Sequence, residues 1–433
     1  MKSKIKLLMF SLILVNLANA QTDGTLDATF NSTGKFTTII ITSRACMGYD
    51  VAVQTDGKII VVGYTMNSAN TFADFAMIRL TTTGSLDATF GTGGIVTTDF
   101  QGDDDVAYGV AIDSDGKIIV VGYSVNGTTF ARNIVIARYT ASGVLDNTFG
   151  SGGKIIGTNT FAEAHDVAIQ SDGKIVVAGW ATGSSYDITL IRLTSAGAYD
   201  NTFGTSGVVV KDLESSNRLD KAFGLRIQSN GKIIVVGCAR DASSNDRIAI
   251  ARFNSDGNSL DTDFNSTGMV INTSISSAIG LDLAVQSDGS VVVIAQTTSV
   301  IVVLRYSSTG SLDTGFGTSG KITTTMNGDA TYGFGECVID ANGNILVTGS
   351  ISSDFGVARY NSSGTLDALF GNSGVAQSDL GSGDRPCGLA ISSTGSIVAA
   401  GYSGYSFAVC QISDTELSEV WAEKLINSTG SGA

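Results

Sequence analysis

Four acidic residues hold one position relative to a recurring glycine, and they are the clearest candidates for chemistry in this sequence. Each lies seven residues before the glycine of a turn: Asp50, Asp166, Asp282 and Glu336. Carboxylate oxygens are the ligands that Ca²⁺ prefers, so four of them at one place would attract this cation. A structural interpretation stays open, in which each carboxylate caps a strand or accepts a hydrogen bond from a neighbouring backbone amide. We predict a candidate Ca²⁺ site; no catalytic residue and no other cofactor is evident.

A second recurring feature pairs an arginine with an aspartate eight or nine residues later. The arginine ends an apolar run, and the aspartate belongs to the phrase Leu-Asp-x-x-Phe or Tyr-Asp-x-x-Phe. The six pairs are Arg79 and Asp87, Arg138 and Asp146, Arg192 and Asp200, Arg252 and Asp261, Arg305 and Asp313, and Arg359 and Asp367. An arginine that recurs from repeat to repeat could bind anions. The fixed spacing to the aspartate instead favours an ion pair that clamps a strand to the loop after it. We predict a structural role for these pairs.

Weaker motifs have simpler explanations. Segments 113–116 and 340–343 begin like a calcium-binding loop, but neither has the glutamate required at position twelve, so both are interpreted as hairpin turns. His165 is the only histidine of the chain, which argues against histidine-based catalysis. The acidic run 103–105 is expected in a solvent-exposed loop. The five cysteines show no Cys-x-x-Cys spacing, and a disulfide between Cys46 and Cys387 stays open.

The composition indicates a folded, acidic chain with its own export signal. The 433 residues include 26 Lys and Arg against 40 Asp and Glu, a net charge of −14, which excludes a nucleic-acid partner. Three lysines, an apolar run at 7–17 and the small residues at 18–20 predict a signal peptide over residues 1–20, cleaved near Ala20. An uncleaved membrane anchor is the alternative. We expect a secreted, extracellular or periplasmic protein with no membrane span in the mature chain.

An internal repeat dominates the rest of the sequence. The phrase with its phenylalanine occurs seven times, and successive phenylalanines lie 52 to 61 residues apart. Each unit contains four short β-rich stretches, which in the first unit are 50–54, 58–64, 74–80 and 94–98. Asp-Gly turns between such stretches are strong hairpin signals, and no unit has a helical crossover, so the strands must be antiparallel. Seven four-stranded units predict an all-β, seven-bladed β-propeller over residues 21–412, followed by a tail at 413–433.

The two ends of the repeat array complement each other. The seventh unit lacks its outer strand and its own Leu-Asp-x-x-Phe phrase, whereas the N-terminus supplies both at 26–30 and 35–41. We therefore predict that the N-terminal strand completes the last blade, with Asp27 facing Gln411. Closure would place the inner strands around a channel. The four acidic residues would then ring its mouth, beside Tyr49 and His165 among others.

The repeat resembles the delta-60 repeat family of bacterial secreted β-propeller proteins. The resemblance rests on Gly-x-Leu-Asp-x-x-Phe-Gly-x-x-Gly, well matched at 83–94, followed by Val-Ala-x-Gln-x-Asp-Gly-Lys-Ile-x-Val-x-Gly. It covers nearly all of residues 22–412, with mild departures at Ala295 and at 394–396. It implies a propeller fold and a secreted or surface location. It supplies no catalytic residues.

These observations lead us to expect a monomeric, non-catalytic binding or interaction scaffold. Its partner would be a protein or a carbohydrate at one face of the propeller, where the longer insertions 66–72, 124–132 and 240–246 would lie. The alternative is a channel-mouth metal-dependent enzyme, such as a lactonase-like hydrolase or a quinone-dependent dehydrogenase. A second alternative is a structural surface component.

Overall fold

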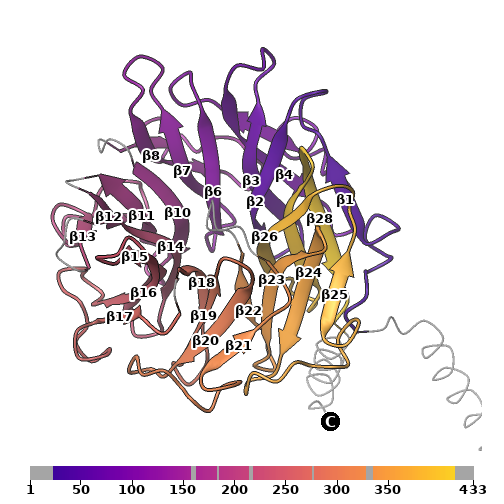
Figure 1. Cartoon of the computed structure of the whole chain (residues 1–433). Coiled ribbons are helices and arrows are strands. Elements are labelled where there is room, and N and C mark those ends of the chain that lie inside the picture. Colours follow the sequence, from indigo (N-terminus) through magenta and orange to yellow (C-terminus); the bar gives the residue numbers. More distant parts are fainter. Residues whose placement is uncertain are drawn as a thin grey trace, which may run out of the picture.

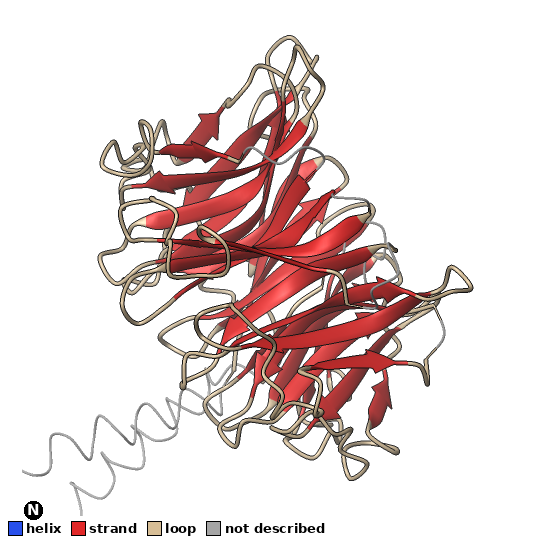
Figure 2. Ribbon diagram, turned by 90° about the vertical axis from the view of Figure 1, so that its left-hand side faces the viewer, coloured by secondary structure: helices blue, strands red, loops and turns tan. Residues whose placement is uncertain are grey.

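The computed structural model describes residues 23–157, 162–182, 185–213, 218–275, 277–327 and 335–414. These residues form seven antiparallel sheets of four strands each, arranged around a central axis (Figure 1). No described residue is helical (Figure 2), and this part of the chain therefore has no helix with the length and apolar character needed to cross a bilayer. The predicted signal peptide and residues 415–433 of the predicted tail lie outside the described residues. The prediction of a seven-bladed β-propeller is confirmed.

Each blade runs from an inner strand at the axis to an outer strand at the rim. The first three blades contain, in this order, β2 (Cys46–Val53), β3 (Ile59–Met66), β4 (Ala73–Leu80) and β5 (Ile95–Thr98); β6 (Asp105–Ile112), β7 (Ile118–Val125), β8 (Arg132–Tyr139) and β9 (Lys154–Ile156); and β10 (Ala162–Ile169), β11 (Ile175–Thr182), β12 (Tyr186–Leu193) and β13 (Val208–Lys211).

The next three blades repeat this order. They contain β14 (Asp220–Ile227), β15 (Ile233–Arg240), β16 (Asp246–Phe253) and β17 (Met269–Asn272); β18 (Ile279–Val285), β19 (Val291–Gln296), β20 (Ile301–Tyr306) and β21 (Lys321–Thr323); and β22 (Cys337–Ile339), β23 (Ile345–Ile351), β24 (Asp354–Tyr360) and β25 (Val375–Ser378).

The seventh blade joins the two ends of the described chain. It contains β26 (Asp384–Ile391), β27 (Ile397–Ser403) and β28 (Ser406–Ile412), and its outer strand is β1 (Lys35–Thr38). β1 pairs antiparallel with β28, and Figure 1 shows the indigo strand beside the yellow one. Gln411 Nε2 also donates a hydrogen bond of 3.0 Å to Asp27 Oδ2. The predicted closure by the N-terminal strand is therefore confirmed.

The core lies between the blades. The second strand of each blade is packed on both faces, which is why Ile59, Ile60, Val61 and Val62 are all buried despite their alternating orientation. The repeat phenylalanine fills the gap between two neighbouring blades. Phe90, for example, lies with Val62 of the first blade and Ile118 of the second in one apolar cluster. Burial of such a side chain contributes about 1.5–3 kcal/mol.

The structure brings each of the six predicted arginine–aspartate pairs together. In every pair the arginine Nε donates to the aspartate Oδ2, at distances between 2.6 and 2.9 Å. The guanidinium also stacks on the repeat phenylalanine, 4.4 Å from the ring centroid for Arg79 on Phe90. A further nitrogen of Arg79 donates to the carbonyl of Ala141 in the second blade. The pair therefore connects a strand, the loop after it and the next blade.

Replacement of Arg192 by alanine should lower the free energy of unfolding by about 3–5 kcal/mol, because it removes the buried cationic partner of the Asp200 carboxylate, which keeps only the more distant Lys174 and hydrogen bonds from Thr202. It also removes a hydrogen bond to the Ser255 carbonyl in the fourth blade and the stacking on Phe203. Thermal or urea denaturation measures the change.

Lys174→Ala is the matched control, since its ammonium also approaches Asp200, at 3.7 Å, from a side chain that is 34% exposed. An exposed partner contributes under about 1 kcal/mol. Equal and small effects of the two substitutions would contradict the structural role of the arginine.

Candidate functional site

A repeated backbone irregularity positions the acidic residues of the channel. A β-bulge interrupts the pairing of β2, β10 and β18 just before Asp50, Asp166 and Asp282, respectively. A bulge inserts one residue and redirects the side chains beside it. Asp50, Asp166 and Asp282 line one cavity in the channel with Glu336, which lies directly before β22, and with Tyr49, Tyr108 and His165 among others. The structure thus brings together the four residues that the sequence pattern singled out.

Each of these carboxylates accepts a hydrogen bond from a backbone amide of the next blade. The acceptor–donor distances are 2.7 Å from Asp50 Oδ2 to Val110 N and 2.7 Å from Asp166 Oδ2 to Leu225 N. Asp282 Oδ2 accepts from Cys337 N at 3.0 Å, and Glu336 Oε2 accepts from Leu389 N. The carboxylates therefore join neighbouring inner strands, as the structural interpretation of the sequence requires.

Arg226 of β14 reaches into this group of carboxylates. Its guanidinium nitrogens lie 3.1 Å from Asp166 Oδ2, 3.0 Å from Asp282 Oδ2 and 3.9 Å from Glu336 Oε1. Sequence analysis missed this residue, although the signal was present. Arg226 lies five residues before the turn glycine Gly231, a position that holds alanine or valine in every other repeat. A single arginine among small apolar counterparts marks a special role.

Burial and mutual repulsion control protonation in the channel. Burial, followed by the charge of Asp166, raises the pKa of Asp50 to about 7. Burial also raises the pKa of Asp166 to about 6, although the charge of Arg226 acts in the opposite direction. Burial acts to lower the pKa of Arg226, but the charges of Asp282, Asp166 and Glu336 raise it above its ordinary value. The group can therefore take up protons close to neutral pH while Arg226 stays charged.

The size of the cavity limits the chemistry that these carboxylates can perform. Its volume of about 40 Å³ accommodates a few water molecules or an ion, since a cavity needs roughly 10–15 Å³ of such volume to hold one water molecule. This volume is small beside the ~300–1,000 Å³ typical of sites for organic ligands. Several carboxylate oxygens already accept hydrogen bonds from amides or from Arg226. A Ca²⁺ ion held by Asp50, Asp166, Asp282 and Glu336 stays a prediction.

An aromatic pocket lies over the second and third blades. Its volume is about 340 Å³, and it is lined by Val125, Phe130, Arg132, Trp180 and Tyr186. Phe130 is 71% exposed and sits in the loop between β7 and β8, inside the insertion 124–132. The rings of Trp180 and Tyr186 pack edge to face, with centroids 4.6 Å apart. We call this region the aromatic pocket.

Charged side chains connect the aromatic pocket to the channel. Arg132 stacks on Tyr123 at 4.2 Å and forms an ion pair with Glu163 of β10. Glu163 Oε2 lies 3.2 Å from Nε2 of His165, which lines the channel cavity. His165 therefore belongs to a network of paired side chains. Sequence analysis selected the loop that carries Phe130 but missed Trp180 and Tyr186, which lie outside it.

The remaining sequence candidates have structural roles. Asp113 Oδ1 accepts hydrogen bonds from the amides of Asp115 and Lys117, and Asp340 repeats this arrangement in its own turn. Cys46 and Cys387 are both buried thiols that form no disulfide, so the open question of a disulfide between them is answered against it. The expectation that 103–105 is a solvent-exposed loop is wrong, because Asp105 begins β6 and is fully buried, and Asp103 is buried as well.

Comparison with known proteins supports the β-propeller repeats, since six segments of the chain match one family model. Six segments match the family model described as "Domain of unknown function (DUF5122) beta-propeller": residues 54–90, 114–149, 170–203, 228–264, 286–316 and 341–370. Each segment runs from the first hairpin turn of a blade to its repeat phenylalanine. No curated protein matches the sequence.

Solved structures share the fold at low sequence identity. Puromycin hydrolase is 14% identical with a TM-score of 0.51, and the match covers 92% of this chain but only 55% of the hydrolase. A polysaccharide lyase of family PL25, an ulvan lyase, is 12% identical over 92% of this chain and 97% of its own, with a TM-score of 0.46. The β-propeller domain of the trilobed protease from Pyrococcus furiosus is 11% identical over 85% and 93%, with a TM-score of 0.45. The likeness to puromycin hydrolase shows the fold alone.

Replacement of Asp50 by asparagine should make stability less dependent on pH. Folding raises the pKa of this carboxyl from its ordinary 3.8 to about 7, so between these values the folded state binds more protons than the unfolded state. Stability of the natural protein therefore falls as the pH rises through this window, by at most roughly 1.4 kcal/mol per pH unit from this group. Urea denaturation at pH 5 and pH 8 measures the difference.

Asp56→Asn provides the control, because Asp56 is an exposed aspartate in the turn of the same blade. It should leave the pH profile of the natural protein unchanged. Superimposable profiles for the natural protein and Asp50→Asn would show that burial does not shift this carboxyl.

Proposed function

We propose that this protein is a non-catalytic binding module of the secreted or cell-surface type, and that it takes a carbohydrate in the aromatic pocket. The observation that carries the proposal is the combination of an exposed aromatic ring, Phe130, with a partly exposed arginine, Arg132, beside Trp180 and Tyr186. Ligand sites typically combine aromatic walls with a few polar groups that fix orientation. A sugar ring presents apolar C–H faces and hydroxyl groups, which matches both kinds of surface.

The dimensions of the pocket favour a small ligand over a protein. Its volume of about 340 Å³ falls at the lower end of the ~300–1,000 Å³ typical of small-molecule sites. A stable protein partner would require about 800 Å² of surface on each side. The side chain of Arg132 is 39% exposed, so its guanidinium can donate to ligand hydroxyl groups while it remains paired with Glu163.

Several features of the chain complete this proposal. The repeats are of the delta-60 type, and the domain division keeps the bounds expected from the sequence, with the propeller at 21–412 ahead of the segment 413–433. Removal of the signal peptide at residues 1–20 near Ala20 would deliver the mature chain outside the cytoplasm. The mature protein acts as a monomer, and its negative charge disfavours nucleic acid as a partner.

A channel enzyme is the second candidate. Raised pKa values of Asp50 and Asp166 at a cavity favour it, because such shifts concentrate at functional sites. The small volume of the cavity and the presence of Arg226 among the carboxylates weigh against it. No observation favours a purely structural surface component.

Removal of aromatic rings from the pocket should weaken carbohydrate binding at least tenfold. A screen of the mature chain on a glycan array identifies the ligand class, and titration calorimetry then compares Phe130→Ala and Tyr186→Ala with the natural protein. A tenfold loss corresponds to about 1.4 kcal/mol of binding free energy.

Tyr405→Ala is the matched control. Tyr405 is a 68% exposed aromatic residue in the corresponding loop of the seventh blade, between β27 and β28. The Tyr405→Ala variant should bind the carbohydrate with unchanged affinity. Absence of binding to any glycan, or equal losses in all three variants, would refute the proposal.

A further inference from the structure

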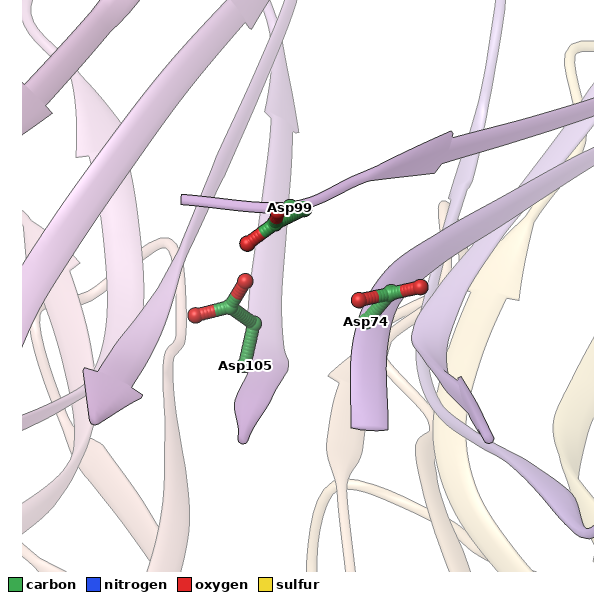
Figure 3. Close-up of side chains that lie close together, drawn as sticks. All are labelled: Asp74, Asp99 and Asp105. Carbon is green, nitrogen blue, oxygen red and sulfur yellow. The ribbon is translucent and has the colours of Figure 1, made fainter. Parts of the chain in front are cut away.

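Three clusters of three aspartates lie at junctions between neighbouring blades. Each cluster combines a residue at the start of the third strand, one just after the fourth strand and the first residue of the next inner strand. The clusters are Asp74, Asp99 and Asp105; Asp187, Asp212 and Asp220; and Asp354, Asp379 and Asp384. Figure 3 shows the first of them, in which a carboxylate oxygen of Asp105 points toward Asp99. We call these groups the aspartate triads.

The triads occur as complete sets. The first aspartate of each triad lies five residues before the arginine of the arginine–aspartate pair. The second lies five residues after the glycine that precedes the fourth strand, and the third lies eleven residues before the turn glycine of the next blade. At the other four junctions none of these positions holds an aspartate; between the fourth and fifth blades, for example, they hold Arg247, Thr273 and Ala278. Three carboxylates close together repel one another. Their occurrence as complete sets of three therefore indicates that each set shares a positively charged partner.

The geometry within the triads is suited to a cation. In each triad one oxygen per residue lies within 4.8 Å of the others. Ca²⁺ binds oxygen at about 2.3–2.6 Å, so ligands on opposite sides of the ion are about 4.6–5.2 Å apart. The three inner-strand aspartates, Asp105, Asp220 and Asp384, all use Oδ2 to accept a backbone amide, at 2.6 to 2.7 Å. This hydrogen bond fixes the carboxylate plane.

The opposite oxygen is left without a partner in two triads. Asp105 and Asp384 have 0% exposure, and Oδ1 of each is buried with no hydrogen bond. A buried carboxylate oxygen without a partner is rare, because desolvation makes it costly. A cation bound between the three carboxylates would give such an oxygen a partner.

The charges around Asp105 also favour a cation in the first triad. Burial raises the pKa of Asp105 to about 7; the neighbouring Ser124 hydroxyl and the Phe100 amide act to lower it, and the charges of Asp99 and Asp74 raise it further. Asp99 and Asp74, the two charged groups named here as acting on this carboxyl, are both negative. In the channel, by contrast, Arg226 supplies the positive charge.

We propose that each aspartate triad binds one Ca²⁺ ion, so that the chain holds three, at the junctions between blades one and two, three and four, and six and seven. All candidate ligands are oxygen atoms, and the partial exposure of Asp74 and Asp99 leaves room for water ligands. Three carboxylates on one ion suit Ca²⁺, whereas Mg²⁺ usually keeps most of its waters.

The first triad also adjoins the loop that carries Phe130. Asp104 Oδ1 accepts from the Ala73 amide at 2.9 Å, and Gln101 Oε1 accepts from Asn126 Nδ2 at 3.0 Å. Asn126 begins the loop that ends at Phe130. An ion in this triad would therefore hold together the start of β4, the segment from Asp99 to Asp105 and the base of the aromatic pocket.

Calcium binding to the mature full-length chain tests the proposal. Calorimetry after EDTA treatment should give three Ca²⁺ per chain, with dissociation constants between roughly 10⁻⁵ and 10⁻³ M. Asp99→Asn, Asp212→Asn and Asp379→Asn should each reduce the number to two, and the triple variant to zero. Each of these three residues is the most exposed member of its triad, so the variants should fold.

A thermal melt provides the second readout. Ca²⁺ should raise the melting temperature of the natural protein by mass action. In EDTA the triple variant should melt at the same temperature as the natural protein or higher, because the substitutions remove repulsion. In Ca²⁺ it should show no shift.

Two further variants make the result specific. Asp115→Asn, at an exposed turn away from the triads, should keep all three ions. Asp166→Asn tests whether the channel carboxylates bind Ca²⁺ instead of the triads. This variant should also keep all three Ca²⁺ ions. Loss of Ca²⁺ binding in Asp166→Asn with retention in the triple variant would overturn the proposal in favour of the channel carboxylates. Absence of Ca²⁺ binding to the natural protein would overturn it outright.

Discussion

The junction between two blades is the constraint on which the rest of this structure depends. Each blade is covered on both faces, so any polar group that enters a junction loses water and must find a partner in the neighbouring blade. The arginine–aspartate clamps meet this requirement near the rim, where Arg79 reaches the Ala141 carbonyl. The channel carboxylates meet it near the axis, where Asp50 accepts the Val110 amide. Polar side chains at these two radii fix the angle at which apolar faces pack.

The repeat made the fold predictable, because each unit reports the same strand pattern independently. Seven copies of one phenylalanine and one turn glycine specified the blades, and the missing strand of the last unit specified the closure between β1 and β28. Side chains close together in sequence, such as Arg192 and Asp200, were also paired correctly. The gathering of Asp50 and Asp166 followed from the ring itself.

Features assembled across blades were harder to predict. Arg226 interrupts a column of small residues, which is visible only when the repeats are aligned position by position. The aromatic pocket combines Phe130 of one blade with Tyr186 of the next, and no spacing rule connects them. The same holds for Asp105, whose position in an acidic run suggested a solvated loop although β6 begins there. Burial depends on the neighbouring blade, and a single repeat does not encode it.

The pairing of β1 with β28 has a consequence for how the protein is made. Asp27 and Gln411, which meet in the closed ring, are separated by 384 residues of chain. Ribosomes add about 5–20 residues per second, so the N-terminal strand waits roughly 20–80 s for its partner. During that interval its backbone amides and carbonyls present an unsatisfied strand edge, which other chains can pair with. The first strand of the propeller to be synthesised is therefore the last to be paired.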